Sequence, residues 1–117
     1  MENKFHEENY AFRLVNVSKK IVDAFKNEFK QKEYKIGYYF KNKGKYVISI
    51  PLKQKLNPIL LSDFVKKNKI SNYGLYCYMS SNRDMDGLSV PSKIVNFYKM
   101  VGGCLDFSYI FMDEKHK

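Results

Sequence analysis

Apolar and polar residues alternate along several short stretches of this chain. A period of two residues is typical of β-strands that bury one face. The strands that this period predicts cover residues 10–15, 34–41, 45–50, 73–80 and 105–111. Asn42, Lys43 and Gly44 separate the second stretch from the third, and Gly44 can adopt the positive φ that a tight turn requires. We therefore expect these two strands to form a hairpin.

Two intervening stretches instead repeat their apolar residues every three to four positions, the spacing of an amphipathic helix. Ser18 is suited to cap the first helix, over about residues 19–32, because its hydroxyl can accept a free backbone N–H. Asn57 and Pro58 are the expected cap and first residue of the second helix. Both segments are interpreted as packing elements that cover a sheet.

A third helix is expected before the last strand. Ser89 can cap it, Pro91 suits its first turn, and Gly102 with Gly103 stops it. The complete order is then β-α-β-β-α-β-α-β.

This order predicts an α+β fold, in which a largely antiparallel sheet carries its helices on one face. The first six elements match the split β-α-β pattern of a ferredoxin-like core, and the added helix and strand extend the sheet. At 117 residues the chain is expected to form a single domain. Residues 1–8 and 113–117 are expected to be loose tails.

The strand pattern also predicts which side chains share the second face of the sheet. Two hypotheses are open for this face: a recognition surface, because tyrosine is enriched at interfaces, or an ordinary hydrated sheet face. The residues expected there are Arg13, Tyr39, Ser49, Tyr76, Tyr78, Asp106 and Ser108.

The formal charge of +9 favours an acidic partner, and nucleic acid is one such class. The charge comes from 19 lysines and only two arginines, Arg13 and Arg83. Arginine is the residue that specific phosphate and guanine contacts favour, and a lysine-rich composition also follows from an AT-rich gene. Where the central signature of an RNA-recognition motif would fall, Lys45, Val47 and Ile50 occupy its three aromatic positions. Binding by that family's mechanism is therefore not expected.

Residues suited to catalysis or metal binding are sparse. His6 and His116 both fall in the expected tails, where a base is poorly held. Cys77 and Cys104 have no ligand-spaced neighbours, so we expect two buried reduced thiols rather than a zinc site. Residues 84–87 superficially resemble a calcium loop but lack its later glutamate. We expect no enzymatic activity, no cofactor and no metal.

The cellular setting is inferred from two negative features of the sequence. The acidic, polar N-terminus does not resemble a secretory signal. No apolar run reaches the ~20 residues that a membrane-spanning helix needs. We therefore expect a cytoplasmic protein that does not associate with a membrane.

The C-terminal third is similar to a bacterial domain family of uncharacterised function. The resemblance covers about residues 73–112 and rests on Gly87-Leu88-Ser89, a helix containing Ile94, and the run Gly102-Gly103-Cys104-Leu105-Asp106-Phe107-Ser108-Tyr109. Some members of that family lie beside polymorphic or contact-dependent toxins and are regarded as immunity proteins. The resemblance implies binding of a cognate toxin and no catalytic residues.

The expected function is therefore that of an immunity protein, which neutralises a toxin by stoichiometric binding and occlusion of its active site. The lysine excess predicts an acidic patch on the toxin. Tyr39, Tyr76 and Tyr78 are the expected anchors, and the expected steering charges are Lys41, Lys43, Lys53 and Lys55. An exposed sheet edge that pairs with a partner strand is an equally reasonable contact. A nucleic-acid-associated protein and a subunit of a larger assembly are the alternatives.

Overall fold

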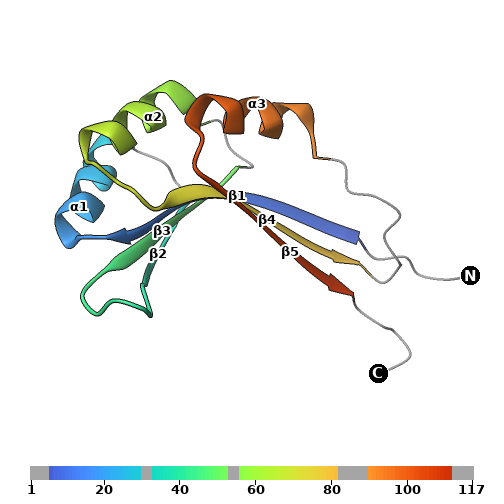
Figure 1. Ribbon diagram of the computed structural model, residues 1–117, viewed down its shortest axis with the longest axis horizontal. Helices are drawn as coiled ribbons and strands as arrows, with labels where there is room; N and C mark the ends of the chain where they lie inside the picture. The colour runs from blue at the N-terminus through green and yellow to red at the C-terminus, as the bar shows by residue number, and fades with distance from the viewer. Residues whose placement is uncertain (1–5, 30–32, 53–55, 82–89, 112–117) are drawn as a thin grey trace, which may run out of the picture.

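The computed structural model describes residues 6–29, 33–52, 56–81 and 90–111, and it contains five strands and three helices (Figure 1). In chain order these are β1 (His6–Val17), α1 (Lys19–Glu28), β2 (Lys35–Tyr38), β3 (Tyr46–Pro51), α2 (Pro58–Lys67), β4 (Tyr73–Ser81), α3 (Ser92–Val101) and β5 (Cys104–Phe111). The predicted order of elements and the predicted α+β class are confirmed.

The strands form one sheet in the order β2-β3-β1-β4-β5. The pairs β2–β3, β3–β1 and β1–β4 are antiparallel, whereas β5 lies parallel to β4. The first four strands have the arrangement of a split β-α-β core, in which β1 and β3 are central. Because α3 carries the chain back to the start of β4, β5 extends this core with a parallel strand.

All three helices lie on one face of the sheet, and the other face has no described helix over it (Figure 1). Phe12 and Leu14 of β1 and Ile48 of β3 are completely or almost completely buried beneath α1 and α2, together with Phe25 and Phe64 of those helices. Phe25 and Phe64 meet edge to face with their ring centroids 5.9 Å apart. This apolar layer fixes which side of every strand faces outward, because side chains alternate between the two faces.

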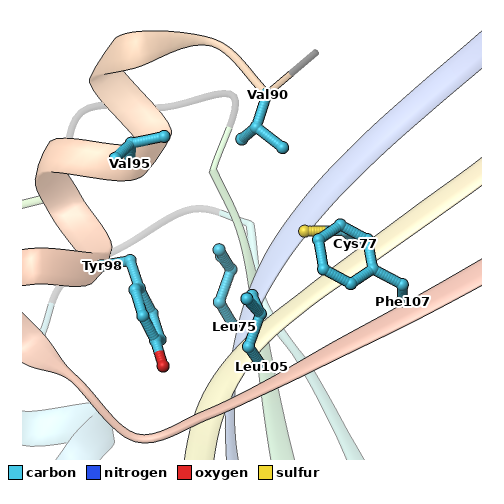
Figure 2. Close-up of a pocket in the computed structure, with 7 residues that line it drawn as sticks. All are labelled: Leu75, Cys77, Val90, Val95, Tyr98, Leu105 and Phe107. Carbon is cyan, nitrogen blue, oxygen red and sulfur yellow. The ribbon is translucent and has the colours of Figure 1, made fainter. Parts of the chain in front are cut away.

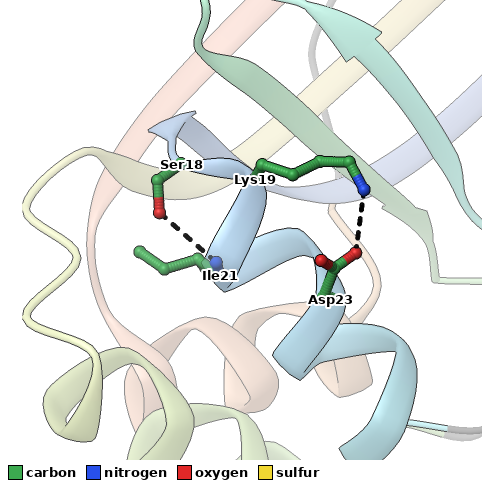
Figure 3. A network of polar contacts seen from close by, with 4 residues as sticks. All are labelled: Ser18, Lys19, Ile21 and Asp23. Carbon is green, nitrogen blue, oxygen red and sulfur yellow. Dashed lines mark hydrogen bonds and ion pairs between the residues drawn. The ribbon is translucent and has the colours of Figure 1, made fainter.

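Local signals explain where the first two helices begin. The Ser18 hydroxyl accepts the backbone N–H of Ile21 at 3.3 Å, and Lys19 pairs with Asp23 one turn later at 3.1 Å (Figure 3). The Asn57 side chain accepts the N–H groups of Ile59 and Leu60 at 3.0 and 3.2 Å. These side chains satisfy donors that a helix cannot satisfy internally. Both predicted caps are confirmed.

Several boundaries differ from those predicted. β1 begins at His6, so residues 6–8, expected in a tail, pair with β4. α1 ends at Glu28 rather than near residue 32. The N-cap of α3 is Pro91, which has no side-chain capping bond, and Ser89, the predicted cap, lies outside the described residues. The differences concern ends of elements, where tertiary pairing decides the boundary more than the local pattern does.

The prediction of two buried thiols is correct for one cysteine only. Cys77 lies on the covered face of β4 and is buried, whereas Cys104 is exposed. Cys104 begins β5, which is the last strand of the sheet, and it lies opposite Gly74. An edge strand has a neighbour on one side only, so its first residue receives little cover.

Candidate functional site

The uncovered face of the sheet carries two of the three predicted tyrosine anchors, side by side with an arginine. In the β1–β4 pairing, Arg13 lies opposite Gly74, and Ala11 lies opposite Tyr76. Because Phe12 and Leu75 point into the covered layer, their strand neighbours Arg13 and Tyr76 point to the other face. Tyr78 follows Tyr76 on the same face, one pleat further along β4. We call Arg13, Tyr76 and Tyr78 the arginine–tyrosine platform.

The arginine of this platform lies over the ring of its neighbour. The Arg13 Cζ is 4.0 Å from the centroid of the Tyr76 ring. The register explains the contact: Gly74 has no side chain, so the guanidinium can reach diagonally across to Tyr76. A cation–π pair of this kind contributes about 0.5–2 kcal/mol, depending on how far it is desolvated. All three platform side chains are partly buried, which holds them in place.

Polar side chains border the platform on both sides. Asp106 and Ser108 of β5 lie opposite Tyr76 and Tyr78, and Ser49 of β3 lies opposite Arg13. The Arg13 Nε is buried and has no hydrogen-bond partner among the described residues. The platform and its border therefore combine aromatic area with the guanidinium of Arg13 and the carboxylate of Asp106. The predicted membership of this face is confirmed by the register for all three of these bordering residues.

The remaining predicted binding residues lie elsewhere. Tyr39 follows β2, its N–H donates to the carbonyl of Lys45 at 2.9 Å, and its ring stands 5.8 Å from that of Phe40. Lys41 reaches over the Phe40 ring, with its Nζ 5.6 Å from the centroid, and Lys43 is exposed in the same turn. These residues form the tip of the β2–β3 hairpin. Lys53 and Lys55 lie outside the described residues.

The hairpin tip and the platform do not form one site. Tyr39 lies near the far end of β2, and β2 is separated from β4 by β3 and β1. With strands about 4.8 Å apart and about 3.3 Å per residue along each strand, the registers place Tyr39 more than about 20 Å from Tyr76. The sequence pattern correctly placed Arg13 on the same face as Tyr76, but it did not predict the stacked contact between them. The missing signal was the register that sets Arg13 opposite Gly74.

A second feature, an apolar groove, lies on the covered face beneath α3. It has a volume of about 140 Å³ and lies between α3 and the strands β4 and β5 (Figure 2). Its floor continues from β4 onto β5, where Leu105 is 44% exposed and Phe107 is 50% exposed. The residues that line it are Leu75, Cys77, Val90, Val95, Tyr98, Leu105 and Phe107. The groove therefore opens toward the edge of the sheet at β5.

The polar groups at this groove are either hydrogen-bonded, as in Tyr98, or uncharged, as in Cys77. Tyr98 uses its hydroxyl to donate to the Gly103 carbonyl at 2.8 Å. Burial raises the pKa of the Cys77 thiol. A raised pKa leaves the thiol protonated and weakly nucleophilic at neutral pH. The pKa of the neighbouring Tyr10 is also raised, first by burial and then by the charges of Glu8 and Cys77. Neither group offers an activated nucleophile.

Within the described ranges, no three histidine, cysteine, aspartate or glutamate side chains come close enough to hold a metal ion. No helix in those ranges is both long enough and apolar enough to cross a membrane. Comparison with family models, with curated proteins and with solved structures found no match to this chain.

Proposed function

We propose that this protein is an immunity protein of the cytoplasm, which neutralises a bacterial toxin by binding it stoichiometrically and covering its active site. The arginine–tyrosine platform is the proposed contact surface. The observation that carries this proposal is the stacked pair of Arg13 and Tyr76 on a sheet face with no described helix over it. Tyrosine and arginine are the residue types that dominate binding energy at protein interfaces.

The strands that carry the platform hold it as a rigid binding surface. Its residues come from β1 and β4, which are antiparallel neighbours within the five-stranded sheet. The other face of the same strands is fixed by buried side chains such as Phe12 and Leu75. Side chains already held in position lose little conformational freedom when a partner binds, so more of the contact energy appears as affinity.

The net charge of +9 supports an acidic toxin surface, as the lysine content predicts. A contact patch of standard size buries about 800 Å² per partner, which corresponds to a radius of about 16 Å. The hairpin tip with Lys41 and Lys43 lies beyond that radius from Tyr76. Its lysines would therefore act on the rate of encounter rather than in the contact itself.

Nucleic-acid binding is the second candidate function, and the aromatic rings of the uncovered face favour it, because bases stack on such rings. Two neighbours weaken this candidate. Arg13 already occupies a face of the Tyr76 ring, and the exposed carboxylate of Asp106 lies opposite the same residue. A phosphate backbone would be repelled by that carboxylate, whereas a protein surface can offer it a hydrogen-bond donor.

The proposal predicts that a toxin domain is encoded beside this gene, and the test begins with that domain. Co-expression of the unsubstituted protein should restore the growth of cells that produce the toxin domain. Calorimetry should give one molecule of this protein bound per toxin domain. Tyr76→Ala should weaken binding by about 2 kcal/mol or more, roughly 30-fold in Kd, because it removes the centre of the platform. The matched control is Tyr38→Ala, since Tyr38 is 83% exposed on β2, away from the platform.

Salt dependence separates the two candidates. Toxin affinity should change little between 50 and 200 mM salt, whereas binding to a phosphate backbone falls steeply over that range. The proposal is rejected if the neighbouring domain is not bound, or if Tyr76→Ala and Tyr38→Ala behave alike. Steeply salt-sensitive binding to single-stranded DNA or RNA that is lost in Tyr76→Ala would favour the second candidate instead.

A further inference from the structure

The two edges of the sheet differ in length. β2 forms one edge and pairs with β3 over four residues, whereas β5 forms the other edge and pairs with β4 over eight residues. Among the described residues no strand lies beyond β5, so within that part of the chain the outward N–H and C=O groups of β5 have no strand partner. A long unpaired edge is a template on which another strand can add.

The apolar groove lies directly beside this edge. Leu105 and Phe107 lie opposite Leu75 and Cys77 and continue their apolar row outward. α3 covers β4 but leaves Leu105 and Phe107 about half exposed, with Val95 and Tyr98 forming the helical wall (Figure 2). A further strand beside β5 would place every second side chain against this row, because side chains alternate between the faces.

We propose that the β5 edge and this groove bind an extended segment of a partner protein as a sixth strand. The segment would pair with the backbone of β5 and direct alternate apolar side chains into the groove. This is the β-strand addition mode of peptide recognition, in which the backbone supplies affinity and the pockets supply specificity. The inference goes beyond the proposed function, because it uses a different surface and holds whether or not the partner is a toxin.

The charges near the edge define the chemistry of this segment. Lys99 lies one turn after Val95 on α3 and is exposed, close to where the chain enters β5. This lysine and the net charge of +9 favour acidic residues flanking the segment. Asp106 projects from β5 on the opposite face, so the segment's outward positions beside it should be uncharged or basic, because like charges opposite one another destabilise strand pairing.

A second copy of this chain fits the edge less well than such a segment. Two copies each carry a charge of +9, and their mutual repulsion opposes pairing of β5 with β5. An acidic, apolar segment removes the same backbone groups from water and is attracted rather than repelled. The occupant that we assign is therefore a segment with alternating apolar and uncharged polar residues and acidic residues at its ends.

The experiment uses the full chain and a fluorescein-labelled peptide of three Val-Thr repeats with two glutamates at each end. Fluorescence anisotropy should detect saturable binding, and amide exchange followed by NMR should show new protection at every second residue of β5. The same peptide N-methylated at alternate residues should lose at least about tenfold in affinity, because it cannot donate to the β5 carbonyls. This control requires no change to the protein.

Protein variants separate this edge from other surfaces. Phe107→Glu should weaken peptide binding at least about tenfold, since it places a charge in the apolar row. Phe40→Glu is the matched control, because Phe40 is 86% exposed at the hairpin tip. Tyr76→Ala should leave peptide binding unchanged, and Phe107→Glu should leave platform binding unchanged, so the two proposals can fail independently.

Four experimental outcomes would each overturn the inference. Equal binding of the N-methylated peptide would show that the groove binds apolar groups without strand pairing. Equal binding of a peptide with lysines in place of the glutamates would remove the acidic preference. A dimer in sedimentation that Phe107→Glu dissociates would show that a second copy occupies the edge. Absence of saturable binding by the first peptide would reject the site altogether.

Discussion

The covered face of the sheet has two unequal halves. Beneath α1 and α2, Phe12, Phe25 and Phe64 belong to one large cluster of buried side chains, and the rings of Phe25 and Phe29 stack 4.8 Å apart. Beneath α3, the buried cluster consists of Leu75, Cys77 and Ile94 with a few partly buried neighbours, and a groove remains open at its side. The same sheet is thus closely packed at one end and thinly covered at the other.

This difference follows from how the chain is built. Most of the large buried cluster comes from the first six elements, and α3 adds Val101 and the partly buried Phe97, whose ring centroid lies 5.8 Å from that of Phe12. The helix α3 and the strand β5 are added at one edge, where Leu75 and Cys77 of β4 are buried but Leu105 and Phe107 of β5 stay about half exposed. The added half therefore contributes less burial to stability but leaves an apolar surface available for binding. Binding surfaces are expected where stability depends on them least.

The largest effect that tests this contrast comes from the same substitution in each half. Phe64→Ala should lower the free energy of unfolding by about 3–5 kcal/mol, because it removes a side chain that is 1% exposed and leaves a cavity. Phe107→Ala should lower it by less than about 1 kcal/mol, since that ring is already half exposed. Urea unfolding followed by circular dichroism measures both. Similar losses in the two variants would show that the halves are equally important to stability.

The sequence predicted those features of the fold that are set by neighbouring residues. Ser18 and Asn57 cap their helices because each needs only the next few N–H groups, and the alternation along β4 correctly placed Tyr76 and Tyr78 on one face. The order of elements then restricted the topology, because connections of this kind are short and right-handed. The ferredoxin-like core was predictable on these grounds.

The candidate surfaces were less predictable, because they depend on residues that are distant in the chain. The Arg13–Tyr76 pair exists only because the register sets Gly74 opposite Arg13. The exposure of Cys104 and Phe107 depends on β5 being the outermost strand, and an alternating pattern cannot report the position of a strand in the sheet. An alternating strand at an edge and one at the centre have the same pattern.

A second prediction sharpens the contrast at the junction between the two halves. A Cβ built on Gly74 would overlap the backbone N and O atoms of Cys104, so β5 can approach β4 closely only at a glycine. Gly74→Ala should lower the free energy of unfolding by about 1–3 kcal/mol and should loosen β5 before the rest of the sheet. Amide exchange should show earlier loss of protection in β5 than in β1.

The matched control for this junction is at the opposite edge. Nothing lies within 4 Å of a Cβ built on Gly37 in β2. Gly37→Ala should change stability by less than about 1 kcal/mol and in the favourable direction, because alanine restricts the unfolded chain. If both glycine variants are equally harmless, the close approach at Gly74 is not what fastens β5 to the core.

The smallest effects concern the helix caps, because α2 in the closely packed half has a capping side chain and α3 in the thinly covered half has none. Asn57→Ala removes the acceptor for two N–H groups of α2 and should cost about 1 kcal/mol of stability. α3 begins at Pro91, which offers no side-chain acceptor. Pro91→Asp would supply a side-chain acceptor to the first turn of α3 and should raise the free energy of unfolding by a few tenths to about 1 kcal/mol. Loss of the proline reduces this gain, because proline restricts the unfolded chain.

The measurement that decides this last prediction is the protection of α3 amides rather than global unfolding alone. If α3 opens separately from the core, Pro91→Asp should slow exchange in α3 while the exchange of α2 amides stays unchanged. Asn57→Ala should instead accelerate exchange throughout the core, because α2 covers the large cluster. Equal changes in both helices would mean that α3 unfolds together with the core, and the thinly covered half would then not be a separate unit of stability.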